Sequence, residues 1–248
     1  MKQIIKPVCW LATPVVAAVV IGVFSEVLHA GSVSLPFNAN NFKSPRDNVY
    51  LPMAIGKTYV YVAEEEDGVV VNEISNTAKA KSVLGVKTTV VRDVEWLIVE
   101  GVGAVKTEET ADWIAWDQFG NVWYFGEDTT EFLYDEDWNP IGTSKSGSWQ
   151  AGVDGAQPGI LMLANPEVGI SYRQEYYEGV AEDTAQVLAV DKTVSIELGD
   201  FEGCVTTKEW TPLEPGSVEH KSYAPGVGLV YIEQLKGKTV KVELVEIR

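Results

Sequence analysis

Tryptophans and carboxylates stand close together around position 120, and they form the densest group of residues that could do chemistry. Flat indole rings can stack on sugar rings, while carboxylates accept hydrogen bonds from sugar hydroxyls, and two carboxylates at a suitable separation can cleave a glycosidic bond. The alternative is a sheet core of aromatic cross-strand pairs with acidic residues at the strand ends. The candidate ligand-binding residues are Trp113, Trp116, Asp117, Trp123, Tyr124 and Glu127.

A hairpin of residues 112–117 and 121–127 would group these side chains by face. On the first strand, alternation predicts one face shared by Trp113 and Asp117. On the second strand, it predicts one face shared by Trp123, Phe125 and Glu127. The connection, Asp117-Gln118-Phe119-Gly120, has the Asp and Gly that a type I turn prefers at its first and fourth positions.

A second group resembles the start of a calcium-binding loop. The run Asp135-Glu136-Asp137-Trp138-Asn139 matches the first five positions, where alternating oxygen ligands can wrap a hard cation. The sixth position is Pro140 instead of Gly, and the twelfth is Ser146 instead of Glu. Two alternatives follow: a turn between two strands, or weak calcium binding through Asp135, Asp137 and Asn139. No other cofactor is predicted.

Charged residues of the second half form a third group. Glu219 and Lys221 should share one sheet face while His220 points to the other, so the pair could neutralise charges across the sheet. A buried charge network is one interpretation, and an acid/base site is the other. The network would consist of Arg173, Glu175, Glu182, Glu219 and Lys221, with Asp183 beside it.

The first 30 residues match a secretory signal peptide, with two lysines, an apolar run and cleavage expected after Ala30. The run is slightly short for a membrane span and contains Pro14, so a retained anchor is the weaker alternative. Removal of this segment leaves 17 basic and 35 acidic residues, a formal charge of −18. Such a body would be repelled by nucleic acids and anionic membranes, and it should stay soluble and monomeric. The expected location is periplasmic or extracellular.

Several kinds of site are excluded by composition. Beyond residue 30 the chain keeps one cysteine, Cys204, and one histidine, His220, so an intrachain disulfide and a multi-histidine zinc site are both excluded. Gly101-Val102-Gly103 lacks the third glycine of a dinucleotide fingerprint, and there is no phosphate loop or nucleophile elbow. No catalytic residue is therefore predicted.

Short β-branched and aromatic runs separated by turn residues predict strands along most of the mature chain. They indicate a mainly β fold, a single-domain antiparallel meander over residues 57–248 that forms a half-open or closed β-barrel. A few short helices are an alternative at 76–82 and 181–189, and residues 31–56, with three prolines, should form an extended N-terminal arm. The strands are predicted at 57–63, 69–75, 86–92, 95–100, 103–116, 121–126, 129–135, around Trp149, and at 171–178, 184–198, 203–210, 218–223, 228–234 and 239–246.

Segments across the mature chain resemble an uncharacterised family of secreted bacterial β-sheet proteins. These segments are 49–52, 56–61, 112–127, 148–152, 158–160, 172–175, 179–183, 219–221 and 225–228. The resemblance implies export and a β fold, and it implies no activity. A more distant, fold-level resemblance to the half-barrel carriers of the bacterial periplasm implies a concave face for an apolar ligand.

Three functions are compatible with these patterns. The leading hypothesis is a non-catalytic binding or structural protein with an aromatic-lined concave face for a small-molecule or lipid ligand. The second is a glycan-binding or glycan-cleaving protein that uses the tryptophan and carboxylate group. The third is a surface protein whose acidic loops bind calcium.

Overall fold

The computed structural model describes residues 31–65, 67–235 and 239–248. The predicted signal peptide lies outside these residues. Within them there is one 3-10 helix, η1 (Ala39–Phe42), and a 16-stranded sheet. The strands are β1 (Ser32–Val33), β2 (Thr58–Glu64), β3 (Val69–Val83), β4 (Val86–Val99), β5 (Gly103–Trp116), β6 (Val122–Tyr134), β7 (Pro140–Ser144), β8 (Trp149–Gln150), β9 (Gln157–Met162), β10 (Ser171–Arg173), β11 (Glu175–Tyr176), β12 (Thr184–Ile196), β13 (Gly199–Trp210), β14 (Val218–Ala224), β15 (Gly228–Gln234) and β16 (Val240–Ile247).

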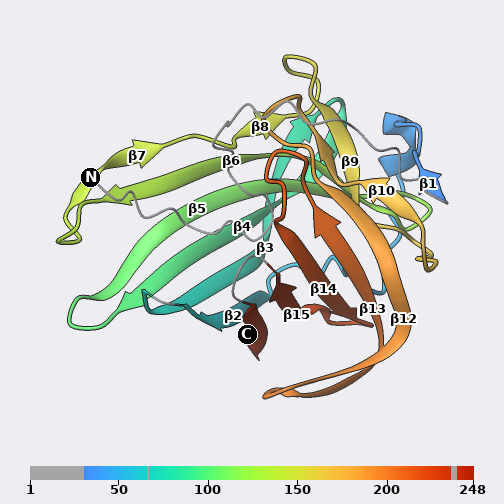
Figure 1. Cartoon of the computed structure of the whole chain (residues 1–248). Coiled ribbons are helices and arrows are strands. Elements are labelled where there is room, and N and C mark those ends of the chain that lie inside the picture. The colour runs from blue at the N-terminus through green and yellow to red at the C-terminus, as the bar shows by residue number, and fades with distance from the viewer. Residues whose placement is uncertain (1–30, 66, 236–238) are drawn as a thin grey trace.

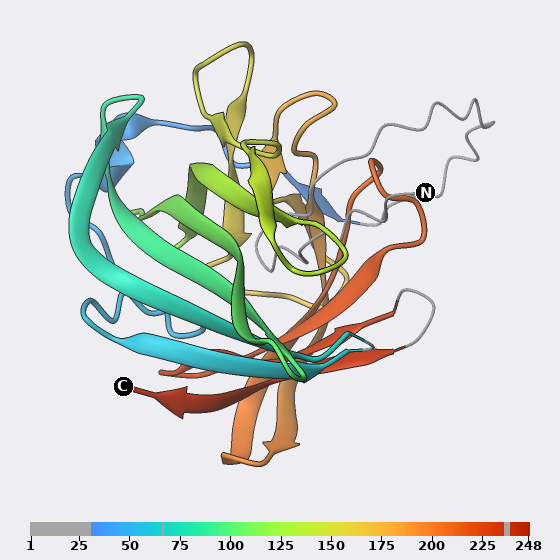
Figure 2. The same cartoon turned by 90° about the vertical axis from the view of Figure 1, so that its left-hand side faces the viewer.

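Two antiparallel meanders make up most of the sheet (Figure 1). One runs from β2 to β6 and the other from β12 to β16, and the C-terminal strand β16 pairs with β2 to join them. Figure 2 shows that the joined sheet curves strongly, so that the two meanders face each other across an interior. The predicted mainly β, antiparallel meander is therefore confirmed.

The sheet is not closed by a continuous ladder of hydrogen bonds. β10 and β11 are consecutive in the chain, yet they lie near opposite ends of the strand order, where β10 pairs with β12 and β11 pairs with β9. Gln174 connects them and is buried. Gly159 faces this connection, and a Cβ there would collide with the Gln174 carbonyl. The two ends of the sheet are thus brought together by the chain itself, in a half-open barrel.

Several predicted boundaries were wrong. The alternative helices at 76–82 and 181–189 lie in β3 and mostly in β12, because cross-strand pairing with β4 and β13 supplies their backbone partners. Residues 86–92 and 95–100 belong mainly to one long strand, β4, and β6 continues through 129–134 without a break. Of the residues between these predicted strands, Asp93 and Glu127 are buried on the inner face, whereas Asp128 is exposed on the outer face, and the ladder runs through all three.

The N-terminal arm packs along one flank of the sheet. Phe37 and Phe42 contact Trp123 and Phe125 edge to face, with ring centroids 5.5–6.1 Å apart. Buried Asn48 donates from Nδ2 to the carbonyl of Gly120 at 2.7 Å. The arm therefore covers the outer surface of β6 as an extended segment, interrupted by η1. In the part of the chain that the structure describes, no helix has the length and apolar character needed to cross a membrane.

Candidate ligand cavity and acidic interior

The turn between β5 and β6 is organised by Asp117. Its Oδ1 accepts the backbone N–H groups of Phe119 and Asn121 at 2.8 and 2.9 Å. Its Oδ2 accepts from Asn121 Nδ2 at 2.9 Å and from Trp123 Nε1 at 3.0 Å. Gly120 N donates to the Asp117 carbonyl, as the predicted type I turn requires. Both carboxylate oxygens are occupied by these hydrogen bonds and the residue is only 2 % exposed, so Asp117 stabilises the turn.

A bulge at Gly126 decides which β6 side chains point inward. Asp112 pairs with Glu127, but Ile114 pairs with Tyr124, so β6 contains one more residue than β5 between these two pairs. Gly126 has φ 122°, and a Cβ on it would collide with the Trp149 carbonyl of β8. Glu127 consequently shares the inner face with Tyr124. The predicted shared face of Trp123, Phe125 and Glu127 was wrong, because simple alternation fails at a bulge.

The three candidate tryptophans are core residues, exposed by only 3–6 %. Trp113 lies against Lys81, whose Nζ is 3.1 Å from the ring centroid. Trp116 donates from Nε1 to the carbonyl of Leu51 at 2.8 Å, and Trp123 packs under the arm. Their low exposure leaves no ring on the surface as a platform for a sugar, although Trp116 borders an interior cavity. The structure thus corresponds to the alternative of a sheet core.

An apolar cavity lies between the two meanders and has a volume of about 80 Å³. Strands β2 to β5 form one wall and β14–β15 the other, while Leu51 and Pro52 of the arm and the β14–β15 turn border it. Trp116 is the predicted ligand-binding residue that lines it. The lining residues are Leu51, Pro52, Tyr59, Tyr61, Ile74, Asn76, Val91, Ile114, Trp116, Leu161, Lys221, Tyr223, Val227, Gly228 and Leu229.

Polar and acidic residues continue from this cavity across the same face of the sheet. Cross-strand partners on β3 to β6 form three rows on this face. The rows are Asn76, Val91, Asp112 and Glu127; then Ile74, Asp93, Thr110 and Thr129; then Asn72, Glu95, Glu108 and Glu131. The six carboxyl-bearing side chains are all at most 8 % exposed. We call these six residues the acidic rows.

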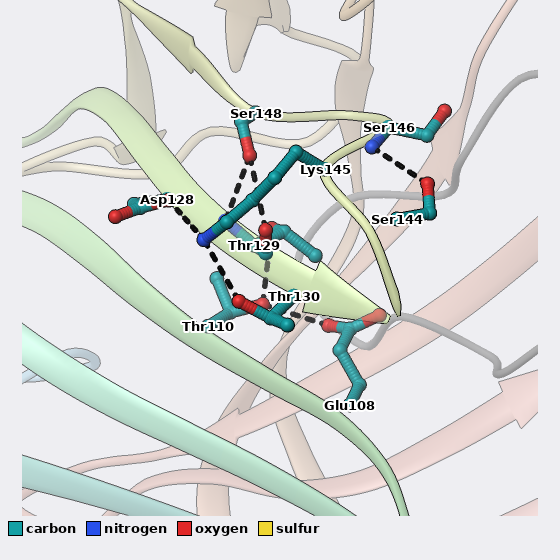
Figure 3. Close-up of polar contacts among 9 residues, drawn as sticks. All are labelled: Glu108, Thr110, Asp128, Thr129, Thr130, Ser144, Lys145, Ser146 and Ser148. Carbon is teal, nitrogen blue, oxygen red and sulfur yellow. Dashed lines mark hydrogen bonds and ion pairs between the residues drawn. The ribbon is translucent and has the colours of Figure 1, made fainter. Parts of the chain in front are cut away.

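The acidic rows are joined by hydroxyl groups on the inner face of β5 and β6. The Thr110 hydroxyl donates to Glu108 Oε1 at 2.8 Å and lies 3.0 Å from the Thr129 hydroxyl. Figure 3 shows this inner group and, from the next residues of β6, Asp128 and Thr130 binding Lys145. The two faces of β6 therefore differ: hydroxyls meet carboxyls inside, while an exposed ion pair forms outside.

Tyr124 connects two carboxyl groups of the acidic rows. Its hydroxyl lies 2.7 Å from Asp112 Oδ1 and 2.8 Å from Glu127 Oε2. A phenol has one proton to donate, so the second contact requires a proton on one of the two carboxyls. Burial raises the pKa of Asp112 to about 7, against the opposing hydrogen bond from Tyr124 and with a further rise from Glu108. Burial also raises the pKa of Glu127 well above its usual range.

Lys221 is the buried cation of the facing wall, 5 % exposed. Its Nζ lies 2.9 Å from Glu209 Oε2 and 3.2 Å from Glu219 Oε2. Burial by itself would lower the pKa of Lys221, but the two carboxylates outweigh it and raise that pKa well above the ordinary value. As predicted, Glu219 and Lys221 share a face, and His220 points away, 4.0 Å from Glu233.

Two members of the predicted charge network lie outside it. Arg173 is exposed and stacks on Tyr176, with 4.2 Å between its Cζ and the ring centroid. Glu182 accepts the N–H of Gly179 at 2.7 Å in a surface turn. Sequence spacing could not show this, because it does not tell which face of β10 turns outward, and the Arg173 side chain at the end of that strand is exposed.

Glu175 is buried, but it contacts Asp183 instead of Lys221. It accepts from Trp149 Nε1 at 3.0 Å, and the nearby carboxyl of Asp183 adds to the rise in its pKa that burial causes. Burial raises the pKa of Glu175, and it raises that of Asp183 to about 7 although Lys221 opposes the rise. The electrostatic effects of Glu127 on Glu175 and of Asp183 on Glu127 show that these carboxyls lie close to the acidic rows.

The calcium-like run forms the turn between β6 and β7. Asp135 Oδ1 accepts the backbone N–H groups of Asp137 and Asn139 at 3.0 and 2.9 Å, and Asn139 Nδ2 lies 3.2 Å from both carboxylate oxygens of Asp135. This carboxylate thus holds the turn in shape. Within residues 31–65, 67–235 and 239–248, no group of three or more His, Cys, Asp or Glu side chains is arranged to hold a metal ion.

Sequence reasoning identified Trp116, Glu127 and Lys221, but it missed Glu209 and the other members of the acidic rows. The acidic rows have a period of two in three consecutive strands, which is visible at Asp93 and Glu95 and at Glu108 and Asp112. That pattern normally indicates a solvated sheet face. Glu209 was missed because its partner Lys221 lies on the next strand, and only the register places the two together.

No family model matches the chain, and no curated protein does. Solved structures show distant likeness. A candidate lipoprotein from Parabacteroides distasonis is 12% identical, covers 82% of this chain and 100% of its own, and has a TM-score of 0.43. A candidate exported protein with a YmcC-like fold from Bacteroides fragilis is 17% identical, with 81% and 99% covered and a TM-score of 0.41. A β-barrel-like domain of unknown function from Brucella abortus is 10% identical, with 77% and 95% covered and a TM-score of 0.38.

Proposed function

We propose that the chain is an exported, non-catalytic binding protein that holds a small apolar ligand inside its curved sheet. The supporting observation is the cavity of about 80 Å³, whose walls are mostly aliphatic and aromatic. A water molecule takes about 30 Å³ in the liquid, so the cavity accepts a small apolar molecule or the apolar end of a longer one.

An empty apolar cavity of this size has an energetic cost. At about 24 cal/mol per Å³ for an enclosed cavity, a volume of about 80 Å³ lowers the free energy of unfolding by at most about 2 kcal/mol, because this cavity is partly open to solvent. A ligand that fills the cavity restores the lost contacts and stabilises the folded state. Space that costs stability and is lined by several strands is what a binding function requires.

The border of the cavity suggests how a ligand enters. Leu51 and Pro52 belong to the arm, Val227 lies in the β14–β15 turn, and Gly228 is the first residue of β15. The arm and this turn are joined by the hydrogen bond from Gly226 N to the Val49 carbonyl at 2.7 Å, and both lie outside the strands, so they can separate without breaking the main ladder. Residues 1–30 have the pattern of a signal peptide, which supports export of the chain. Its high negative charge favours a soluble monomer.

Xenon binding, followed by xenon-129 NMR, tests the cavity without assuming a natural ligand. Val91→Ile adds one methylene to the lining and should weaken binding, whereas Ile114→Val removes one and should strengthen it. Val168→Ile, on a side chain that is 60 % exposed, is the matched control. Equal xenon binding by the wild-type chain and both lining variants would refute the proposal. Native mass spectrometry of the freshly purified protein then identifies any ligand that it carries.

A further inference from the structure

The cavity and the acidic rows are parts of one inner surface. Tyr61, Ile74 and Val91 line the cavity, and their direct cross-strand partners are Asn72, Asp93 and Asp112. Directly opposed side chains begin about 5 Å apart. A molecule in the cavity therefore lies within one side-chain length of two buried carboxyl groups.

Two of these cross-strand partners of the cavity residues carry an acceptor atom without a hydrogen-bond partner among the described residues. Asn72 is 1 % exposed; its Nδ2 donates to Asp93 Oδ1 at 2.5 Å, while its Oδ1 has no hydrogen-bond partner among the described residues. Asp112 is fully buried, and within the same part of the chain its Oδ2 also lacks a partner. Buried polar atoms without partners are rare in folded proteins and call for a ligand or an ordered water.

In the part of the chain that the structure describes, the ionisable side chains where the cavity meets the acidic rows are acidic and lack cationic partners. No ion pair within 4 Å joins Asp93, Asp112 or Glu127 to a cationic side chain of the described residues. On the facing wall, Lys221 is already held by Glu209 and Glu219, so an anionic head group placed there would meet two carboxylates. The interior thus favours a cation and disfavours an anion.

We propose that the ligand is a small apolar amine, with its alkyl part in the cavity and its ammonium group hydrogen-bonded to Asp112 Oδ2 and to the carboxyl group of Asp93. This inference rests on the proposed function and specifies its ligand class. An ammonium group has three donors, enough to bind the unpartnered Asp112 Oδ2 and the neighbouring carboxyl of Asp93, its diagonal neighbour across β4 and β5. Binding of the cation displaces a proton from the acidic rows to solvent, so charge balances without any other reactant.

Acid should weaken this binding. The groups that face Asp112 are Asp93 on β4, Glu108 on β5, and Tyr124 and Glu127 on β6, with Glu175 and Asp183 beyond them. All but Tyr124 are carboxyls, which hold more protons as the pH falls. An ammonium group must compete with those protons at pH 5 and meets less competition at pH 8.

Calorimetry with matched four-carbon ligands tests the proposal: n-butylamine, 1-butanol and butyrate. At pH 8, butylamine should bind at least tenfold more tightly than butanol, and the preference should shrink at pH 5. Asp112→Asn and Glu127→Gln, each close in shape to a neutral acid, should reduce the preference at least fivefold. Asp128→Asn changes the neighbouring exposed carboxylate, paired with Lys145, and should leave it unchanged.

The outcomes separate this inference from the proposed function. Equal binding of butylamine and butanol, or tightest binding of butyrate, overturns the amine inference while the cavity function stands. If the wild-type protein binds neither xenon nor any of the three four-carbon ligands, both the proposed function and the amine inference are refuted. Thermal melting of each variant shows whether it is folded, and a preference that persists in both folded carboxyl variants also overturns the inference.

Discussion

The interior carboxyl groups predict that the protein is more stable in mild acid than at neutral pH. Burial raises the pKa of Asp112 from its ordinary value of 3.8 to about 7. Between these pH values the folded protein keeps a proton that the unfolded chain has lost, so stability falls as the pH rises. From pH 5 to pH 7, where Asp112 becomes half ionised in the folded protein, this residue alone should lower the free energy of unfolding by about 2.3 kcal/mol.

Asp183 acts in the same direction, since burial raises its pKa to about 7 as well. Urea unfolding of the ligand-free mature protein at pH 5 and pH 7 measures the total effect. Asp112→Asn should remove the share of Asp112 and flatten the pH dependence, whereas Asp128→Asn should not, because the Asp128 side chain is 59% exposed. A free energy of unfolding that is constant or rises from pH 5 to pH 7 would show that these carboxyls are ionised in the folded protein.

Three further perturbations probe the same interior. Lys221→Met should destabilise the protein by about 3–5 kcal/mol at pH 7, because Glu209 and Glu219 then lose their cation, and by less at pH 5. Urea unfolding measures the loss, and the exposed Lys145→Met, expected to lose less than about 1 kcal/mol, is the control. A similarly small loss for Lys221→Met would contradict this prediction. Gly126→Ala should cost about 2 kcal/mol or more, because the added methyl meets the Trp149 carbonyl. The control is Gly142→Ala, where φ is also positive but the added methyl meets nothing; equal melting temperatures of the two variants would be inconsistent with the bulge. The melting midpoint should be the same with calcium as with a chelator, since the Asp135 carboxylate already accepts hydrogen bonds within its own turn. A clearly higher midpoint with calcium would indicate that this loop binds the ion.

Much of the fold could be predicted from local patterns. Alternation and turn residues located strands that match β2, β5, β12, β14 and β15 closely. The Asp117–Gly120 turn followed from the preferences of its two end residues, and its hydrogen bond is present. These features depend on neighbours within a few positions, so a single segment contains enough information to specify them.

The site depended on contacts that no segment contains. The acidic rows have the same period of two as a solvated face, and alternation does not show which face turns inward. The bulge at Gly126 moved Glu127 to the inner face, where Tyr124 joins it to Asp112. The tryptophans suggested an open sugar platform, but the arm and neighbouring strands cover them.

By itself, the sequence determined that the chain beyond residue 30 is strongly acidic, lacks the residues for a disulfide or a multi-histidine zinc site, and consists of strands joined by tight turns. Only the tertiary structure decided that the carboxyls of β4 to β6 lie inside, beside a cavity that faces Lys221. The physical reason is that strand formation depends on local backbone and side-chain preferences. Burial, by contrast, depends on how β2 and β16, from opposite ends of the domain, pair and curve the sheet.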